Sequence, residues 1–345
     1  MSAKRVLFLC DASDIDIVDK SFAQNDAYHV TVETTEKILD YGVKSYLERT
    51  IELIKEYPTM YDGVVGTHDS SAVFASIICD HTQNTFASIP SIINCQNKYL
   101  SRIKQQQVLP QAVPEFCLAL DYLMDTSRLS TPFFIKPVRS NISFGTHIVH
   151  SSEELEYYIS LESKDVAAHN QYYLDALSVC PHISNGINIA TSNNFLCESL
   201  ITGEQVTVDG YISQGEVHIL GMTKASFYPG SNSFSHHEFP YSFSPELDRK
   251  IKNGISTLIP ALGIENSFFN VELRADVEQE TFFILEVNSR IAFQFAKTIE
   301  LVTGFDPLQL LCDLACNQSP QPSTSFQNTY PLCVNFELHS FSDQR

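Results

Sequence analysis

The chain has 345 residues, a length that suggests two or three domains. Its 22 Lys and Arg against 41 Asp and Glu give a net charge of −19, which argues against nucleic acid and anionic membranes as partners, because both are bound mainly through Lys and Arg. Hydrophobic residues make up 43% and charged residues 18%, as in an ordered globular protein. The first apolar run, residues 6–10, is too short for a signal-peptide core or a membrane span, so we expect a cytoplasmic protein.

The nine cysteines are odd in number and irregularly spaced, so they predict no disulfide framework. Reduced thiols are typical of the cytosol. Cys312 and Cys316 lie four residues apart in an apolar segment, a spacing that favours two core residues on one helix face over a metal or redox pair.

In the first third of the chain, strand-like and helix-like segments alternate, which predicts a parallel sheet covered by helices. One helix is indicated by a single apolar stripe of Val43, Leu47, Ile51 and Ile54. No GxGxxG follows the first strand, so a dinucleotide fingerprint is absent. We expect strands at 5–10, 29–33, 62–66 and 89–93, and helices over 43–54 and 70–81.

The rest of the chain predicts mostly antiparallel strands. Ser151 and Ser244 are good N-caps for two helices, because a hydroxyl accepts from free backbone amides. Residues 318–325 are rich in Pro, Ser, Gln and Thr and predict a linker. Further strands are expected at 132–137, 146–150, 194–200, 205–213, 215–223, 268–273 and 282–287, and helices at 97–107, after 151, after 244 and after 306.

Acidic and amide side chains lie on two neighbouring predicted strands near residues 270 and 286. Glu286 and Asn288 share one face because strand side chains repeat every two residues, and Glu272 lies across from them if the strands pair. Such oxygen ligands suit Mg²⁺. The alternative, of equal weight for these residues alone, is that Glu286 and Asn288 face solvent on an outer sheet surface.

A second polar feature is the loop that follows the strand ending in Lys136. Backbone amides of the loop through Gly145 can fold over an anion, with Lys136 and Arg139 as positive partners. With one glycine in the loop, a plain hairpin is the favoured alternative. The strand before Gly203 can pair its backbone with an adenine edge, although by itself it indicates only the end of a hairpin.

The order of these features resembles the ATP-grasp superfamily, most closely its carboxylate–amine ligases. The resemblance covers residues 5–316 and rests on Lys98, Lys136, Glu198 before the turn at Gly203, Glu272, and the run 286–290. It implies an α/β (α+β) ATP-grasp fold. The implied parts are a Rossmann-like parallel-sheet domain at 1–95, a central and lid domain at 96–200, an antiparallel-sheet domain with the metal site at 201–317, and a linker-like tail at 318–345.

The resemblance also implies roles for individual residues toward ATP. The phosphates would contact Lys98 and Lys136, with the loop closing over them. The adenine would contact Glu198 and the backbone of Leu200, and the ribose would contact Glu204 or Gln205. The full implied nucleotide set is Lys98, Lys136, Arg139, Ser143, Gly145, Glu198, Leu200, Glu204 and Gln205.

The metal and substrate sites follow from the same resemblance. Glu272 and Glu286 would share one Mg²⁺, and Glu286 and Asn288 would hold a second, with Mn²⁺ as a possible replacement. Arg290 would neutralise the substrate carboxylate and the acyl-phosphate, which makes Arg290 and Lys136 the predicted catalytic residues. Near the substrate we expect Lys224, His236 and His237, and also His68 and Asp69 at the end of a strand.

The implied activity is an ATP-dependent ligase that activates a carboxylate, expected to be that of an amino acid, as an acyl-phosphate and joins it to an amine. Its partners would be small-molecule carboxylate and amine substrates, and a homodimer is possible. Related ligases often carry an acid where this chain has Gln205. They also often continue beyond the position of Arg345, so we expect a substrate pocket that is more open or that is completed by a partner chain. Two alternatives stay open: a catalytically inactive nucleotide-binding or regulatory subunit, and a carboxylase-type ligase with another nucleophile.

Overall fold

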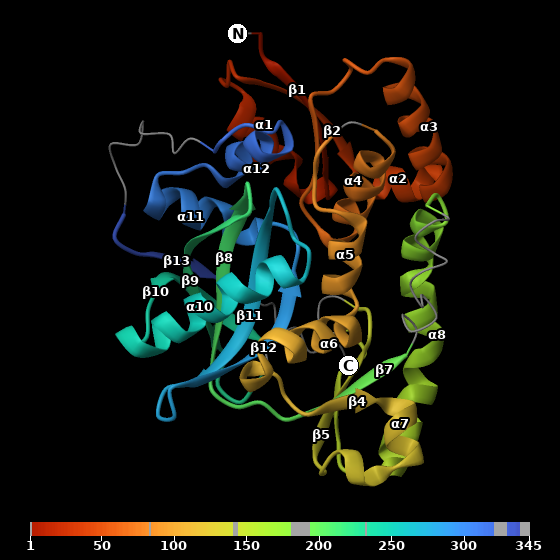
Figure 1. Ribbon diagram of the computed structural model, residues 1–345, viewed down its shortest axis with the longest axis vertical. Coiled ribbons are helices and arrows are strands. Elements are labelled where there is room, and N and C mark those ends of the chain that lie inside the picture. Colours follow the sequence, from red (N-terminus) through yellow and green to blue (C-terminus); the bar gives the residue numbers. More distant parts are fainter. Residues whose placement is uncertain are drawn as a thin grey trace.

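The computed structural model describes residues 2–82, 84–140, 144–180, 194–231, 233–320 and 330–338. The strands in these ranges form a three-stranded, a four-stranded and a six-stranded sheet (Figure 1). Helices cover the sheets, and residues 307–315, from late in the chain, pack against the first of them.

The first sheet is parallel, with β1 at its centre in the order β2-β1-β3. The predicted stripe on α3 is confirmed, because Val43, Leu47, Ile51 and Ile54 are all buried. The elements of this part are β1 (Lys4–Cys10), α1 (Ile15–Phe22), β2 (Tyr28–Thr34), α2 (Thr35–Tyr41), α3 (Val43–Glu56), β3 (Gly63–Gly66) and α4 (Asp69–His81).

The strand predicted at 89–93 is wrong, because these residues begin the helix α5 (Ile89–Gln96). Ser88 caps the helix by accepting from the backbone amide of Ser91, and a proline occupies the first turn, where its missing N–H costs nothing. The apolar residues of this short segment therefore follow helical rather than strand periodicity.

The four-stranded sheet is antiparallel, in the order β4-β7-β5-β6. The long helix α8 packs on β6 near its beginning, and its last turns pack against α3 and α4 of the first unit (Figure 1). The strands of the predicted lid are thus joined to the first sheet by one helix. The elements are α6 (Lys98–Val108), β4 (Phe116–Leu118), α7 (Ala119–Met124), β5 (Phe133–Pro137), β6 (His147–Val149), α8 (Ser152–Leu177) and β7 (Phe195–Ser199).

The six-stranded sheet has the order β12-β11-β8-β9-β10-β13. Its β13 comes from the predicted linker-like tail and pairs with β10, while residues 321–329 of that tail lie outside the described residues. The strands are β8 (Glu204–Ser213), β9 (Glu216–Phe227), β10 (Phe234–Tyr241), β11 (Ser267–Asp276), β12 (Thr281–Asn288) and β13 (Cys333–Phe336).

One face of this sheet is covered by α10 (Pro245–Ala261), whose apolar side packs on Val208, Val271 and Leu273. The opposite face carries polar side chains at the alternate positions of β8, β11 and β12. Because α10 covers only the apolar face, the polar face is left to line a binding site.

The last two helices, α11 (Ala296–Thr303) and α12 (Pro307–Ala315), return the chain to the first sheet. At Gly63 of β3 an added Cβ would lie 3.0 Å from the Cβ of Ala315, so glycine permits this close packing. Cys312 is fully buried, which supports its predicted place in the core.

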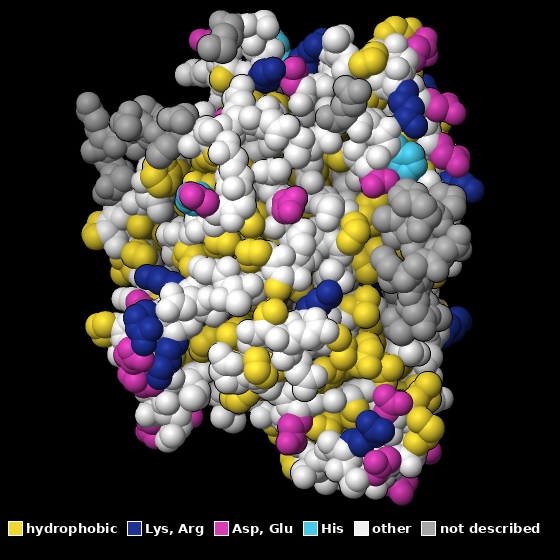
Figure 2. Space-filling view, viewed as in Figure 1, with side chains coloured by type: hydrophobic (Ala, Val, Ile, Leu, Met, Phe, Trp, Pro, Cys, Tyr) yellow, Lys and Arg dark blue, Asp and Glu magenta, His cyan; other side chains and the backbone are white. Residues whose placement is uncertain are grey.

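All nine cysteines are free thiols. No helix among the described residues has the length and apolar character needed to cross a membrane. On the face shown in Figure 2, charged side chains gather mostly toward the periphery, for example over α10, and most of the centre is uncharged.

Candidate active site

The polar face of the six-stranded sheet brings the three predicted metal ligands together. Glu272 on β11 is directly opposite Glu286 on β12, and Asn270 is directly opposite Asn288. Burial and the neighbouring Glu286 carboxylate raise the pKa of Glu272 to about 7. Two facing carboxylates of this kind repel one another until a cation lies between them.

The orientation of Glu286 depends on an irregularity in β12. Glu272 pairs with Glu286, but the next residue, Leu273, pairs with Ile284, so Leu285 is an extra residue in the ladder. The bulge reverses the inside–outside alternation, so that Ile284 and Val287 both face the core while Glu286 faces the site. The carbonyl of Leu285 accepts a 2.9 Å hydrogen bond from Nη2 of Arg102.

Lys98, at the start of α6, reaches the same place. Its Nζ lies 3.0 Å from Oε1 of Glu286 and donates a 2.6 Å hydrogen bond to the carbonyl of Ser140, and the residue is only 7% exposed. The N-cap Asn97 fixes the first turn by accepting from the amide of Leu100. The lysine therefore neutralises part of the paired acids.

These residues fit a divalent hard cation. Glu272, Glu286 and Asn288 offer carboxylate and amide oxygens, the donor types that Mg²⁺ accepts with phosphate and water. The amide of Asn288 is oriented by its neighbour, because its Nδ2 donates 3.2 Å to Oδ1 of Asn270. That bond leaves Oδ1 of Asn288 as the atom available to a cation.

Lys136 and Glu198 form a buried ion pair in the four-stranded sheet. Nζ of Lys136 lies 2.6 Å from Oε2 of Glu198, and Nε of Arg102 lies 2.5 Å from Oε1. Burial alone would raise the pKa of Glu198, but the two cations hold it at about 2. Burial lowers the pKa of Lys136, and Glu198 partly offsets that effect. The carboxylate is thus ionised and orients both cations.

Arg139 has many partners on the lid side of the site. Its guanidinium donates to Oε1 of Gln96 (2.9 Å), to Oδ1 of Asn170 (2.9 Å) and to the hydroxyl of Tyr172 (2.7 Å). It also lies 4.0 Å from the ring centroid of Tyr173. These contacts tie the loop after β5 to α5 and α8.

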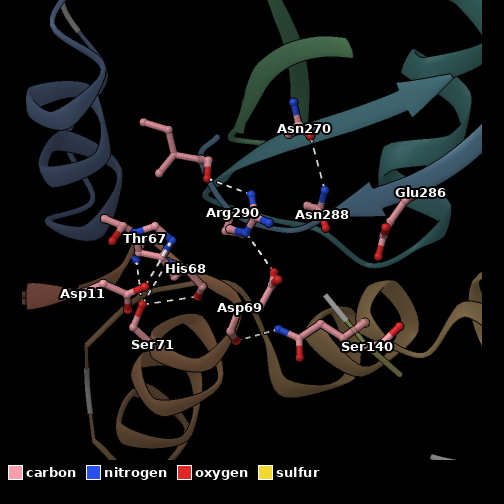
Figure 3. Close-up of polar contacts among 12 residues, drawn as sticks. Asp11, Thr67, His68, Asp69, Ser71, Ser140, Asn270, Glu286, Asn288 and Arg290 are labelled. Carbon is pink, nitrogen blue, oxygen red and sulfur yellow. Dashed lines mark hydrogen bonds and ion pairs between the residues drawn. The ribbon is translucent and has the colours of Figure 1, made fainter. Parts of the chain in front are cut away.

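Arg290, just after β12, contacts the first unit. Its Nε donates a 2.8 Å hydrogen bond to Oδ1 of Asp69, at the start of α4 (Figure 3). Burial opposes ionisation of Asp69, but the guanidinium outweighs it and lowers the pKa of the carboxyl. Gln96 holds the same turn by donating to the backbone carbonyl of Asp69 at 2.7 Å.

A small pocket lies between these groups, where the three sheets and their helices meet. Burial and the charge of Arg139 lower the pKa of His169 on its wall, which favours the neutral imidazole. The residues that line the pocket are Asp69, Gln96, Arg139, Ser140, His169, Tyr172, Glu286 and Asn288.

The residues predicted for the ribose lie at the start of β8. Oε2 of Glu204 accepts 2.8 Å hydrogen bonds from Nζ of Lys224 and from the hydroxyl of Tyr241. Oε1 of Gln205 lies 3.4 Å from Nη2 of Arg274. The structure therefore brings Lys224, which we predicted near the substrate, beside the predicted ribose residue Glu204, because Lys224 pairs across the hairpin with Val206.

His236 and His237 lie on β10, the third strand from β11, rather than beside Arg290. Nε2 of His236 is 3.1 Å from Glu238, and His237 is buried against Phe295. As the strand alternation predicts, only one of the pair faces inward. The described contacts thus give neither histidine a partner in the Glu272–Glu286 pair.

The remaining nucleotide candidates lie around the four-stranded sheet. Leu200 follows β7 and is 43% exposed. Gly145 has a φ of 66°, and a Cβ there would come within 2.9 Å of Pro137, so this turn requires glycine. Ser143 lies outside the described residues.

Three residues that contact the predicted site residues or their partners were not predicted from the sequence. Asn270 precedes Glu272 by two residues, so strand periodicity was a usable signal for it. Arg102 follows Lys98 by four residues on α6, a spacing that places both on one helix face. Asp209, by contrast, joins the site through strand pairing alone, because it lies opposite Asn270.

Comparisons with known proteins identify the domain and the fold. Residues 129–298 match the family described as the ATP-grasp domain. No curated protein sequence matches the chain.

Solved structures with the same fold cover nearly the whole chain. The L-amino acid ligase from Bacillus licheniformis has a TM-score of 0.70 and 18% identity, over 97% of this chain and 80% of that one. Phosphoribosylglycinamide synthetase from Anaerococcus prevotii has a TM-score of 0.62 and 16% identity, over 92% and 76%. The biotin carboxylase domain of Hydrogenobacter thermophilus 2-oxoglutarate carboxylase, in complex with MgADP, has a TM-score of 0.65 and 15% identity, over 91% and 70%.

These similarities confirm the predicted ATP-grasp fold, while the boundaries at 95, 200 and 317 stay predictions. The chain therefore contains an ATP-grasp domain at residues 129–298 and has an ATP-grasp fold along its length.

Proposed function

We propose that the protein is an ATP-dependent ligase that joins a carboxylate, of an amino acid by preference, to an amine. The observation that carries this proposal is the meeting of the Glu272–Glu286 pair with Lys98 in one place, beside Arg290 and its partner Asp69. Paired acids for metal and adjacent cations for phosphate and carboxylate are the parts that phosphoryl transfer needs.

In the proposed reaction, a carboxylate oxygen attacks the γ-phosphorus of ATP, and the bond to the β-phosphate oxygen breaks to release ADP. The amine nitrogen then attacks the acyl carbon, the C–N bond forms, and phosphate leaves with the bonding electrons. Arg290 would neutralise the carboxylate and the acyl-phosphate, and Lys98 and Lys136 would contact the phosphates. When bound, two Mg²⁺ or Mn²⁺ ions would supply charge neutralisation at the phosphates, held by Glu272, Glu286 and Asn288.

The adenosine would lie between the four-stranded and six-stranded sheets. Glu198 and the backbone of Leu200 would hold the adenine, and Glu204 and Gln205 would meet the ribose. The loop with Arg139, Ser143 and Gly145 would close over the phosphates and keep water from the acyl-phosphate. The similar fold of an L-amino acid ligase supports an amino acid as the carboxylate substrate.

We also infer that the protein acts in the cytoplasm on small molecules, with no nucleic acid or membrane partner, and that it can form a homodimer. Nine free thiols and a net charge of −19 support the first part of this inference.

The decisive experiment incubates the protein with MgATP and pools of amino acids and follows phosphate release. We expect release only when a suitable carboxylate and amine are both present, and none from Glu286→Gln, while the exposed-site control Glu56→Gln keeps full activity. Nucleotide binding without release in any pool would contradict the ligase and indicate a nucleotide-binding role. Release with bicarbonate in place of an amino acid would indicate a carboxylase-type ligase.

A further inference from the structure

A group of ionisable side chains lies where β1 and β3 end, and it includes His68, which the sequence placed near the substrate without a chemical role. Asp11 and Asp14 follow β1, and His68 follows β3 (Figure 3 labels Asp11 and His68). The carboxyl ends of parallel strands commonly form ligand sites in open α/β sheets.

His68 is fixed in place by its neighbours. Its Nε2 lies 2.5 Å from Oδ2 of Asp14, a residue only 8% exposed, and its ring lies 5.7 Å from that of Phe293. The backbone amide of His68 donates a 2.9 Å hydrogen bond to Oγ of Ser71. Because a carboxylate accepts only, Nε2 carries the proton toward Asp14, and Nδ1 is the ring nitrogen without a proton.

The other nitrogen of the imidazole faces Asp11. Nδ1 of His68 lies 3.8 Å from Oδ2 of Asp11, and the two side chains are 30% and 35% exposed. Oδ1 of Asp11 is buried and has no hydrogen-bond partner among the described residues. An amino group that approaches the exposed part of Asp11 would gain the attraction of its carboxylate.

This group adjoins the place proposed for the activated carboxyl. Asp69, the next residue after His68, holds Arg290 at 2.8 Å, and Phe293 extends from the segment after Arg290 to pack against the His68 ring. An amine held by Asp11 and His68 would therefore lie beside the carboxyl that Arg290 neutralises.

We propose that Asp11, Asp14 and His68 form the site that binds and deprotonates the amine substrate, an inference that rests on the proposed ligase function. Asp11 binds the amino group, and Asp14 orients the imidazole. One proton passes from the ammonium group to Nδ1 of His68, which frees the lone pair of the nitrogen. As the nitrogen attacks the acyl carbon, the C–O bond to phosphate breaks, and the second proton leaves the nitrogen with the departing phosphate. The preferred amine is thus one that is cationic near neutral pH, such as the α-amino group of an amino acid.

The test compares two nucleophiles for one activated carboxylate. Hydroxylamine is uncharged at neutral pH and traps acyl-phosphates as hydroxamates without needing a base. His68→Asn should lower amide formation by about 100-fold or more, the lower end of what general base catalysis contributes, and leave hydroxamate formation close to wild type. Asparagine is also a favourable N-cap for α4, so the helix start is kept.

Asp11→Asn provides an independent variant. It should raise the KM for the amine by about tenfold, the loss expected for one charge-assisted hydrogen bond, with hydroxamate formation unchanged. His29→Asn, at an exposed position of β2, is the matched control and should change neither product.

Several outcomes would overturn the inference. Equal losses of amide and hydroxamate in His68→Asn would indicate a structural role, and full amide formation in that variant would exclude the base. A wild-type protein that forms hydroxamates but no amide with any amine would support carboxylate activation and remove the amine site. Absence of both products despite ATP binding would instead contradict the ligase function itself.

Discussion

Asp69 and Arg290, 221 residues apart in the sequence, form a 2.8 Å hydrogen-bonded ion pair. The pair joins the start of α4 in the first unit to the end of β12 in the six-stranded sheet. Both side chains are more than four-fifths buried, at 18% and 17% exposure, so the guanidinium is held in one orientation. The residue proposed to neutralise the acyl-phosphate is thus positioned by a different part of the chain.

Replacement of Arg290 by lysine should impair turnover more than nucleotide binding. Lysine keeps the charge but lacks the planar fork that contacts Asp69 and the carbonyl of Ile291 together. We expect kcat to fall by about 10² to 10³, as when one donor to a developing anion is removed. Steady-state kinetics and ATP titration measure the two effects, with exposed Arg249→Lys as control. An equal loss of ATP affinity would contradict this role.

Asp209 should control cation binding without being a ligand. Its Oδ1 accepts a 2.9 Å hydrogen bond from Asn270, whose Oδ1 in turn accepts from Asn288. Asp209→Ala should weaken Mn²⁺ binding by roughly 10 to 100-fold, the usual effect of residues that orient metal ligands. Asp209→Asn keeps an accepting oxygen and should retain most of the affinity. Calorimetric titration measures both, and equal affinities in the two variants would argue against orientation through Asn270.

Arg139 should contribute to stability through its contacts with α5 and α8. Arg139→Lys removes the bonds that a planar guanidinium makes to Gln96, Asn170 and Tyr172 together. We expect a loss of about 2 to 4 kcal/mol in the free energy of unfolding, measured with urea, against almost none for the exposed Arg128→Lys. An Arg139→Lys protein as stable as wild type would contradict this structural role.

Glu198 should make stability depend on pH in the acid range. Its pKa is about 2 in the folded protein against an ordinary 4.5, so its contribution is complete above pH 4.5 and is lost as the pH falls toward 2. This difference between the folded and ordinary pKa of Glu198 corresponds to on the order of 3 kcal/mol in the free energy of unfolding.

Glu198→Gln should therefore be less stable than wild type at pH 7, and the gap should narrow below pH 4.5. Urea unfolding at a series of pH values measures the gap. A gap independent of pH between 7 and 3.5 would show that the ion pairs of Glu198 with Arg102 and Lys136 do not carry this stability.

The sequence alone determined most elements, because their signals are local, and the ATP-grasp fold was implied by the resemblance that the order of the motifs carries. The apolar stripe on α3, the caps at Ser151 and Ser244, and the alternation along β11 each depend on residues close together in the chain. The prediction failed at 89–93, where a run of five residues is too short to separate strand from helix periodicity.

Tertiary structure alone decided how the site is assembled. The bulge at Leu285 directs Glu286 toward Glu272, and strand pairing brings Asp209 to Asn270. Strand pairing across the hairpin brings Lys224 beside Glu204. Packing between units brings Asp69 into contact with Arg290. Register, bulges and contacts between units depend on residues far apart in the chain, so local patterns can name the charged residues of this protein but cannot pair them.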